Sequence, residues 1–164
     1  MDIRPATLPD AEAIAAIYAH WVEHSVVTFD VEAPSPDAWA RRLADSAEQG
    51  LPVLVGEEDG EVVGYAAVTP WKPKLAYRWS VEDSVYLAPS ALGGGRGRAL
   101  LERLLHVTAE AGFRRVVAAI ADAGSPSSVA LHTDLGFTPI GRMPRIGWKQ
   151  DRWVDVDLLQ LDLD

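Results

Sequence analysis

Four glycines lie within the five positions 93–97, between two segments with clear secondary-structure signals. Residues 81–87, before them, are rich in β-branched and aromatic side chains and predict a strand. Residues from about 97 to 111 form an amphipathic run that predicts a helix. Glycine at a helix entrance costs stability because it loses more backbone freedom on folding than other residues. The order strand, glycines, helix therefore indicates a place where the backbone closely approaches a ligand.

Two known phosphate-binding patterns do not fit this loop. The dinucleotide fingerprint needs a glycine where Arg98 or Leu100 stands, and the P-loop needs a Gly-Lys-Ser/Thr sequence that does not follow. The phosphate-binding hypothesis that remains uses the backbone N–H groups of residues 93–98 at a helix N-terminus, with Arg96 and Arg98 as charge partners. A plain strand-to-helix connection is the alternative that the loop alone leaves open.

The rest of the chain predicts one α/β domain over residues 1–164, with a mixed sheet of about six to seven strands and about four helices. Asp59-Gly60 between two apolar runs predicts a hairpin, and Ser35-Pro36 predicts a helix start. Strands are expected in 2–7, 51–70, 78–87, 114–121 and 138–163, helices in 8–24, 37–49, 97–111 and 127–137, and a loop with a β-like middle in 25–36.

Charge and cysteine content exclude several classes of function. The formal net charge is −9, which argues against nucleic acid and an anionic membrane as partners. The chain has no cysteine, so disulfides, thiolate metal sites and a cysteine nucleophile are excluded. The first residues carry no basic-then-apolar signal pattern, and no apolar run is long enough to cross a bilayer. We expect a cytoplasmic protein.

Several motifs, in order, carry a resemblance to a known family. The segment "VYLAPSALGGGRGRALLERLL" resembles the acetyl-CoA signature Q/R-x-x-G-x-G/A of the GNAT N-acetyltransferases, with Gly95 and Gly97 at the two small positions and Leu92 in place of Gln or Arg. "SVVTF", "PWKPKLAYRWSVEDSVYL", "SSVALHTDLGF" and "GWKQDRWVDVDLLQLDL" are similar to the phosphinothricin and methionine sulfoximine acetyltransferase branch of that family. The resemblance covers nearly the whole chain.

The resemblance implies a GNAT fold, acetyl-CoA as co-substrate and a homodimer. It implies acetyl transfer to the primary amine of a small amino-acid-like substrate of the phosphinothricin, methionine sulfoximine or methionine sulfone type. Without cysteine, direct attack in a ternary complex is the simpler route. Two alternatives stay open: an acetyltransferase for a polyamine or a peptide N-terminus, and an acyl-CoA-binding module without turnover.

The resemblance also assigns residues to the cofactor and to catalysis. Glu82 is the expected general base, and burial would have to raise its pKa for that role. His132 stands where many of these enzymes carry a tyrosine and is expected to act as an acid or to contact substrate. Backbone groups of the strand are expected to bind the acetyl carbonyl and the pantetheine amides. The expected cofactor-binding residues are Val85, Tyr86, Leu87, Gly93, Gly94, Gly95, Arg96, Gly97, Arg98 and Ser125, the last in place of a usual asparagine.

Substrate recognition is expected from loops that face the thioester. Arg78 is the best partner for a substrate carboxylate because its guanidinium matches carboxylate geometry. The other expected substrate-binding residues are Phe29, Lys74, Tyr77 and Trp79. "HWVEH", residues 20–24, matches an H-x-x-E-H zinc pattern, but the large chain and distant carboxylate ligand of such enzymes are missing. We therefore expect no metal.

Overall fold

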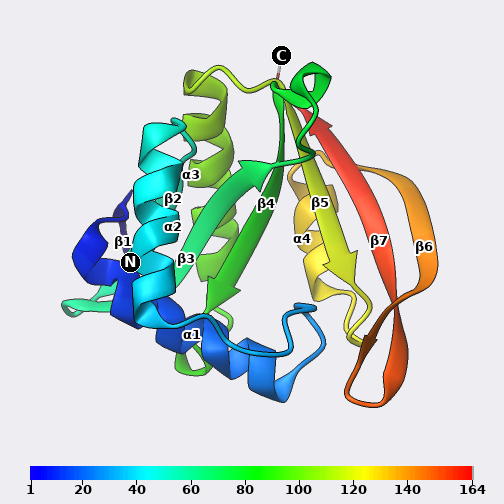
Figure 1. Cartoon of the computed structure of the whole chain (residues 1–164), viewed down its shortest axis with the longest axis horizontal. Helices are drawn as coiled ribbons and strands as arrows, with labels where there is room; N and C mark the ends of the chain where they lie inside the picture. The colour runs from blue at the N-terminus through cyan, green and yellow to red at the C-terminus, as the bar shows by residue number, and fades with distance from the viewer. Residues whose placement is uncertain (164) are drawn as a thin grey trace.

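One seven-stranded sheet, with two helices on each face, organises the computed structural model, which describes residues 1–163 (Figure 1). The mixed α/β sheet and its element order confirm the fold class predicted from the sequence. The strands are β1 (Asp2–Pro5), β2 (Val53–Glu58), β3 (Glu61–Pro70), β4 (Ser80–Leu87), β5 (Arg115–Ala121), β6 (Thr138–Lys149) and β7 (Arg152–Asp162), and the helices are α1 (Ala11–His24), α2 (Pro36–Glu48), α3 (Arg96–Glu110) and α4 (Ser127–Asp134).

The sheet has the strand order β1-β2-β3-β4-β5-β7-β6. Of these neighbouring pairs, β4 and β5 alone run parallel, and α3 makes the crossover between them. The pair therefore holds the centre of the sheet, with hairpin-connected strands on either side. This arrangement brings the end of β4, where the glycines follow, and the end of β5, where α4 follows, to the same edge of the sheet, although the two ends lie apart (Figure 1).

Each face of the sheet has its own core. On the α3 and α4 face, Leu100, Leu101 and Leu104 are fully buried against the strands. On the α1 and α2 face, an aromatic cluster fills the space between helices and sheet. Its rings lie 5.2–5.5 Å apart in mostly edge-to-face contacts, a geometry that aromatic pairs prefer. The cluster consists of Tyr18, Trp39, Tyr65 and Tyr86.

Local sequence signals explain most element boundaries. Ser35 caps α2 by accepting a hydrogen bond from the Ala38 amide at 3.2 Å, and Pro36 opens the helix. Asp59 and Gly60 have φ of 51° and 82°, as a two-residue hairpin turn between β2 and β3 requires. The β-like middle expected within residues 25–36 was wrong, because that connection forms no strand.

The connection between α1 and α2 is instead tied to the β6–β7 hairpin. Lys149 on β6 is buried and donates a hydrogen bond to the Thr28 carbonyl at 2.8 Å. Phe29 lies directly over Gly147, where any side chain at residue 147 would overlap its ring. None of the helices in the described chain is long and apolar enough to cross a membrane.

Gly64 on β3 tests the packing that places β4. A methyl group at residue 64 would lie 2.5 Å from Leu87 Cδ2 and 3.0 Å from the Tyr86 carbonyl oxygen, so Gly64→Ala forces β3 and β4 apart. We expect a loss of about 1–3 kcal/mol in the free energy of unfolding, measured in urea. Gly141→Ala on β6 is the matched control, since its methyl group meets nothing within 4 Å. Equal stability of the two variants would contradict this packing.

Candidate active site

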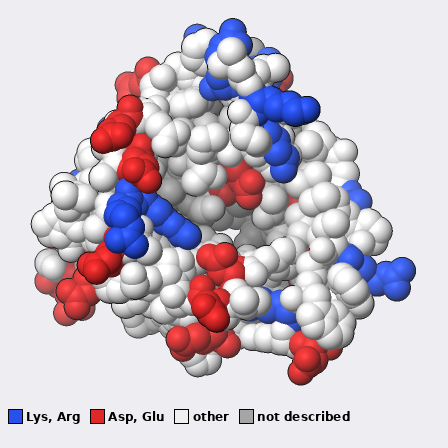
Figure 2. Space-filling view, viewed as in Figure 1, with Lys and Arg blue, Asp and Glu red and all other residues white. Residues whose placement is uncertain are grey.

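The parallel strands β4 and β5 separate after three paired positions. Their ladder joins residues 80–82 to 115–117, and Glu82 opposite Val117 is its last pair. Beyond it, β4 continues to pair with β3 and β5 with β7, so the two strands stay in the sheet while a gap opens between them. Figure 2 shows this face hollowed at its centre, over the gap, with carboxylate side chains on two sides of the hollow.

Backbone groups of alternate β4 residues point into the gap. Ala88 donates to Val63 and Trp71 to the Ser80 carbonyl, so the even-numbered residues of β4 bond to β3. Val85 and Leu87 therefore direct their N–H and C=O groups toward the gap, whereas the backbone of Tyr86 bonds toward β3. The Leu87 carbonyl already accepts a hydrogen bond from the Trp21 ring N–H at 2.8 Å.

The glycine loop bends the chain from β4 into α3. Gly93, Gly94 and Gly95 have φ of 82°, 62° and 78°, a region that favours glycine strongly over residues with a Cβ. The first helical hydrogen bond runs from the Ala99 amide to the Gly95 carbonyl at 3.0 Å. The Arg96 amide donates to the Gly93 carbonyl at 3.5 Å. The amides of Gly97 and Arg98, in the first turn, are donors of a helix start without a helical partner, where the helix dipole also favours an anion.

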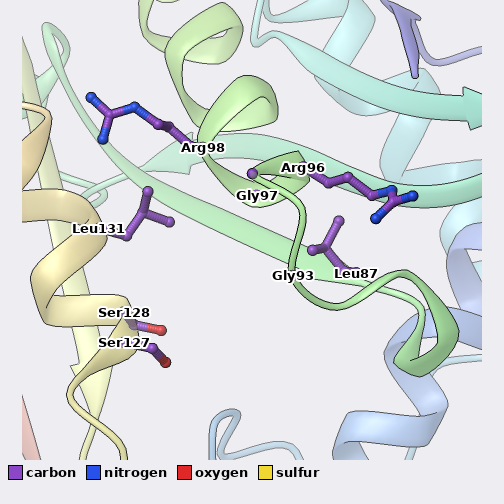
Figure 3. A pocket seen from close by; sticks show the side chains of 9 residues that line it. Leu87, Gly93, Arg96, Gly97, Arg98, Ser127, Ser128 and Leu131 are labelled. Atoms are coloured by element: carbon purple, nitrogen blue, oxygen red, sulfur yellow. The ribbon is translucent and has the colours of Figure 1, made fainter.

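These donors border a pocket between the first turns of α3 and α4 (Figure 3). Leu87 and Leu131 lie on opposite sides of it, and the side chains of Arg96 and Arg98 point away from each other. Apolar walls beside a row of backbone donors suit a chain of methylene groups that ends in phosphates. The pocket is lined by Leu87, Gly93, Gly95, Arg96, Gly97, Arg98, Ser127, Ser128 and Leu131.

Both arginines of the loop already have carboxylate partners. The Arg96 guanidinium makes two 2.9 Å hydrogen bonds to Glu58, and its Nη1 atom lies beside Gly94. Arg98 contacts Glu102 at 3.0 Å on its own helix. A phosphate would therefore compete with these carboxylates for the arginines, so the backbone donors are the better-prepared anion ligands.

Ser125 lies outside the pocket that its sequence position suggested. It is exposed, and its hydroxyl donates to the Ser127 hydroxyl at 3.0 Å. Ser127 and Ser128, in the first turn of α4, line the pocket instead. Sequence reasoning missed both serines, although two consecutive hydroxyl side chains at a helix start are a recognisable signal for binding polar groups.

Glu82 stands at the point where the gap opens. Residues 82 and 86 of a strand share one face, so its side chain points to the side of α1 and α2, where Tyr86 packs. Glu82 is half-buried, and its burial, together with the charge of Asp83, raises its pKa, while Lys72 acts in the opposite direction. A raised pKa makes the ionised carboxylate a stronger base, as the proposed role requires.

His132 contacts a buried carboxylate on the other face of β4. Its Nε2 atom lies 2.9 Å from Asp83 Oδ2, and its Nδ1 atom lies 2.7 Å from the Ser128 carbonyl oxygen. Burial lowers the pKa of His132, but the hydrogen bond to Asp83 and its charge outweigh burial and leave the pKa raised. Asp83, which the sequence did not single out, is buried and lies next to Glu82 in the chain.

The residues expected to bind substrate lie on two loops. Lys74, Tyr77, Arg78 and Trp79 are exposed on the β3–β4 connection. Arg78 stacks over Trp79, with its guanidinium carbon 5.1 Å from the ring centre. Phe29 lies on the α1–α2 connection, against Gly147. Four of these residues thus lie just before or at the start of β4, and Phe29 lies against the β6–β7 hairpin. Their roles in substrate binding stay predictions.

The zinc-like pattern on α1 has a structural explanation. The His20 and His24 rings stack at 4.6 Å, and His24 Nδ1 lies 2.9 Å from the His20 carbonyl oxygen. Within residues 1–163, no group of three or more His, Cys, Asp or Glu side chains has a geometry that could hold a metal ion.

Comparison with known proteins identifies the family. Residues 14–137 match the acetyltransferase (GNAT) family. The chain is 40% identical over 155 residues to a phosphinothricin N-acetyltransferase of Alcaligenes faecalis, covering 94% of this chain and 79% of that one. It is 41% identical over 169 residues to the L-amino acid N-acyltransferase MnaT of Escherichia coli, covering 100% and 95%.

Solved structures agree with this similarity. The acetyl-CoA complex of yncA from Salmonella typhimurium has a TM-score of 0.97 at 38% identity, covering 100% of this chain and 94% of that one. A phosphinothricin acetyltransferase of Sinorhizobium meliloti, also in complex with acetyl-CoA, has a TM-score of 0.93 at 38% identity, covering 98% and 87%. The chain belongs to the GNAT acetyltransferase family. It is an acetyl-CoA-dependent N-acetyltransferase, as the sequence predicted.

Gly95 tests whether the loop conformation binds the cofactor. Gly95→Ala forces a side chain into a left-handed backbone, and we expect it to weaken acetyl-CoA binding at least about fivefold, measured by calorimetry. Gly112→Ala is the control, because Gly112 has φ of 93° just beyond the other end of α3 and equally open surroundings. Both variants should lose about 1 kcal/mol of stability. Similar affinity in both would count against cofactor binding by this loop.

Proposed function

We propose that this enzyme transfers the acetyl group of acetyl-CoA to the primary amine of a small amino-acid-like acceptor of the phosphinothricin, methionine sulfoximine or methionine sulfone type. The observation that carries the proposal is Glu82, a half-buried carboxyl with a raised pKa, at the point where the β4–β5 gap opens. Leu87, at the end of β4, lines the pocket at the start of α3 that would take the phosphates of the cofactor. The relatives named above act on acceptors of this class by their names, which supports the same chemistry here.

Each part of the site has a role in the transfer. Glu82 accepts a proton from the acceptor ammonium, directly or through water, which frees the nitrogen lone pair for attack on the thioester carbon. The Val85 amide, directed into the gap, donates to the carbonyl oxygen as negative charge develops on it. A C–N bond forms, the C–S bond breaks, and the second proton of the attacking nitrogen passes to the departing thiolate, so that coenzyme A leaves as the thiol. The chain has no cysteine that could carry the acetyl group, so the group passes directly between the two substrates while both are bound.

We assign recognition of the acceptor to the β3–β4 and α1–α2 connections, the first of which carries Lys72, whose charge acts on Glu82. Arg78 supplies a planar cation for the carboxylate of an amino acid, and stacking on the Trp79 ring restricts the orientation of its guanidinium. Lys74 and Tyr77 lie on the same connection. Phe29 forms an apolar wall on the opposite side, where the hairpin supports it. We further propose a cytoplasmic homodimer, for which the family resemblance is the support.

Replacement of the base tests the mechanism. Glu82→Gln keeps the shape of the side chain but cannot accept the proton, so we expect kcat to fall at least about tenfold with unchanged affinity for acetyl-CoA. In the wild type, kcat should fall as the pH decreases through the raised pKa of Glu82, because the protonated carboxyl is no base. This acidic limb should be missing in the variant. An unchanged rate across the pH range would remove Glu82 from the mechanism.

Substitution of Arg78 tests the acceptor class. We expect Arg78→Ala to raise KM for methionine sulfone at least about fivefold, and to leave KM unchanged for the corresponding amine that lacks a carboxylate. Arg103→Ala, an exposed arginine on α3, is the control. The measurement is thiol release from acetyl-CoA with phosphinothricin, methionine sulfoximine, methionine sulfone, common amino acids and polyamines. Faster turnover of polyamines would favour the alternative acceptor, and cofactor binding without thiol release would favour a binding module.

A further inference from the structure

A buried histidine–carboxylate contact lies directly behind the proposed base. The side chains of Asp83 and His132 are 2% and 8% exposed, and their contact is 2.9 Å long. Of the two Asp83 oxygens, Oδ2 faces His132, whereas Oδ1 is buried without a hydrogen-bond partner in the described chain. A buried oxygen without a hydrogen-bond partner lowers the free energy of unfolding, so this carboxylate destabilises the fold.

The hydrogen bonds of His132 define its protonation. Its Nδ1 atom faces the Ser128 carbonyl, which accepts only, so Nδ1 carries a proton. Its Nε2 atom faces the Asp83 carboxyl group, so the contact contains one proton that either group can carry, and the raised pKa of His132 favours the pair of imidazolium and carboxylate. Because both ring nitrogens are engaged, His132 has no free N–H group with which to protonate a leaving thiolate. We therefore consider a role for this residue that acts through Asp83.

The position of the pair points to that role. Asp83 is the first β4 residue beyond the ladder with β5, and His132 comes from α4, which follows β5. The contact thus joins two elements that border the gap, 49 residues apart in the chain. His132 also packs edge-on against Phe137, at 4.9 Å between ring centres. Its hydrogen-bond partner Ser128 lines the pocket between the first turns of α3 and α4.

We propose that Asp83 is a positioning residue that acts through Glu82: its contact with His132 holds β4 at the edge of the gap and places a negative charge next to the base. The inference rests on Glu82 as the base of the proposed function. His132 then anchors the Asp83 carboxylate and limits its charge, and the acid or substrate-contacting role that the resemblance implies stays a prediction.

Two charged groups besides burial change the pKa of Glu82. Asp83 on β4 raises the pKa of Glu82 and Lys72 on the β3–β4 connection lowers it, after burial as the largest cause. On the same face, Glu82 acts on Tyr86, whose own pKa is raised chiefly by burial. On the other face, the α3 side chains of the core are leucines. Removing the charge of Asp83, or the charge of His132 that offsets it, should therefore change the pKa of Glu82.

Two substitutions change the charge and keep the contact. With Asp83→Asn, the new amide can donate to the neutral imidazole, so the hydrogen bond survives without a charge. With His132→Gln, the amide nitrogen takes the place of Nε2 and donates to a carboxylate that is no longer neutralised. We expect the pKa of Glu82 to fall in the first variant and to rise in the second. The acidic limb of kcat should move to lower and higher pH, respectively.

The direct measurement is a carbon-detected NMR titration of the glutamate carboxyl groups, with the Glu82 signal identified by its loss in Glu82→Gln. The exposed pair His106–Glu110, at 3.3 Å on α3, supplies matched controls in Glu110→Gln and His106→Gln, which should leave the Glu82 titration unchanged. If Asp83→Asn does not fold, the double variant with His132→Gln, which joins two amides, carries the same expectation of a lowered pKa.

Opposite shifts in the two variants support the inference, because a merely structural role would move the Glu82 pKa in one common direction or leave it in place. Shifts of the same sign, or none beyond the controls, overturn it. The titration contains neither acetyl-CoA nor amine, so its result is independent of the acceptor. Opposite shifts together with an unchanged rate in Glu82→Gln would refute the proposed base and leave the coupling of Asp83 to Glu82 intact.

Discussion

The separation of β4 from β5 is the constraint on which the site depends. Two parallel strands at the centre of a sheet normally hydrogen-bond along their whole length, but here the ladder ends at Glu82 and Val117. The backbone groups of Val85 that would have continued it are left directed into the gap. Such groups are costly when they stay unpaired, and an elongated ligand that carries amides can satisfy them. The same defect in the sheet thus creates both the space and the donors.

The period of the strand then assigns adjacent residues to opposite sides of the gap. Glu82 belongs to the face of α1 and α2, with Tyr86, and Asp83 belongs to the face of α3 and α4, with His132. Two neighbouring acids therefore experience different surroundings, one half-buried beside a hollow and one buried against a histidine. In the proposed function the acceptor amine reaches the gap from the first face and the cofactor phosphates lie at the start of α3 on the second, an arrangement that suits direct transfer between two bound substrates.

Local signals predicted most of the fold. The Asp59-Gly60 turn and the Ser35 cap each depend on residues close in sequence, and the glycine loop before α3 was recognised in the same way. The predicted helix 97–111 differs from Arg96–Glu110 by one residue at each end. The partners of charged residues were not predictable, because nothing near Asp83 in sequence indicates His132, 49 residues away. Likewise, Glu58 lies 38 residues from Arg96, which it engages.

The charge of the chain favours backbone donors over side chains in the proposed binding of an anionic cofactor. A net charge of −9 repels a phosphate at long range, although salt screens this repulsion beyond about 8 Å. Arg96, which could have countered it, is neutralised by Glu58. Backbone N–H groups and a helix dipole act over the first turn only, carry no net charge and require no competing partner to be displaced. Three glycines with positive φ therefore have two effects. They allow the bend of the backbone, and they direct uncharged N–H donors toward the proposed site of an anionic ligand that the net charge of the chain does not attract.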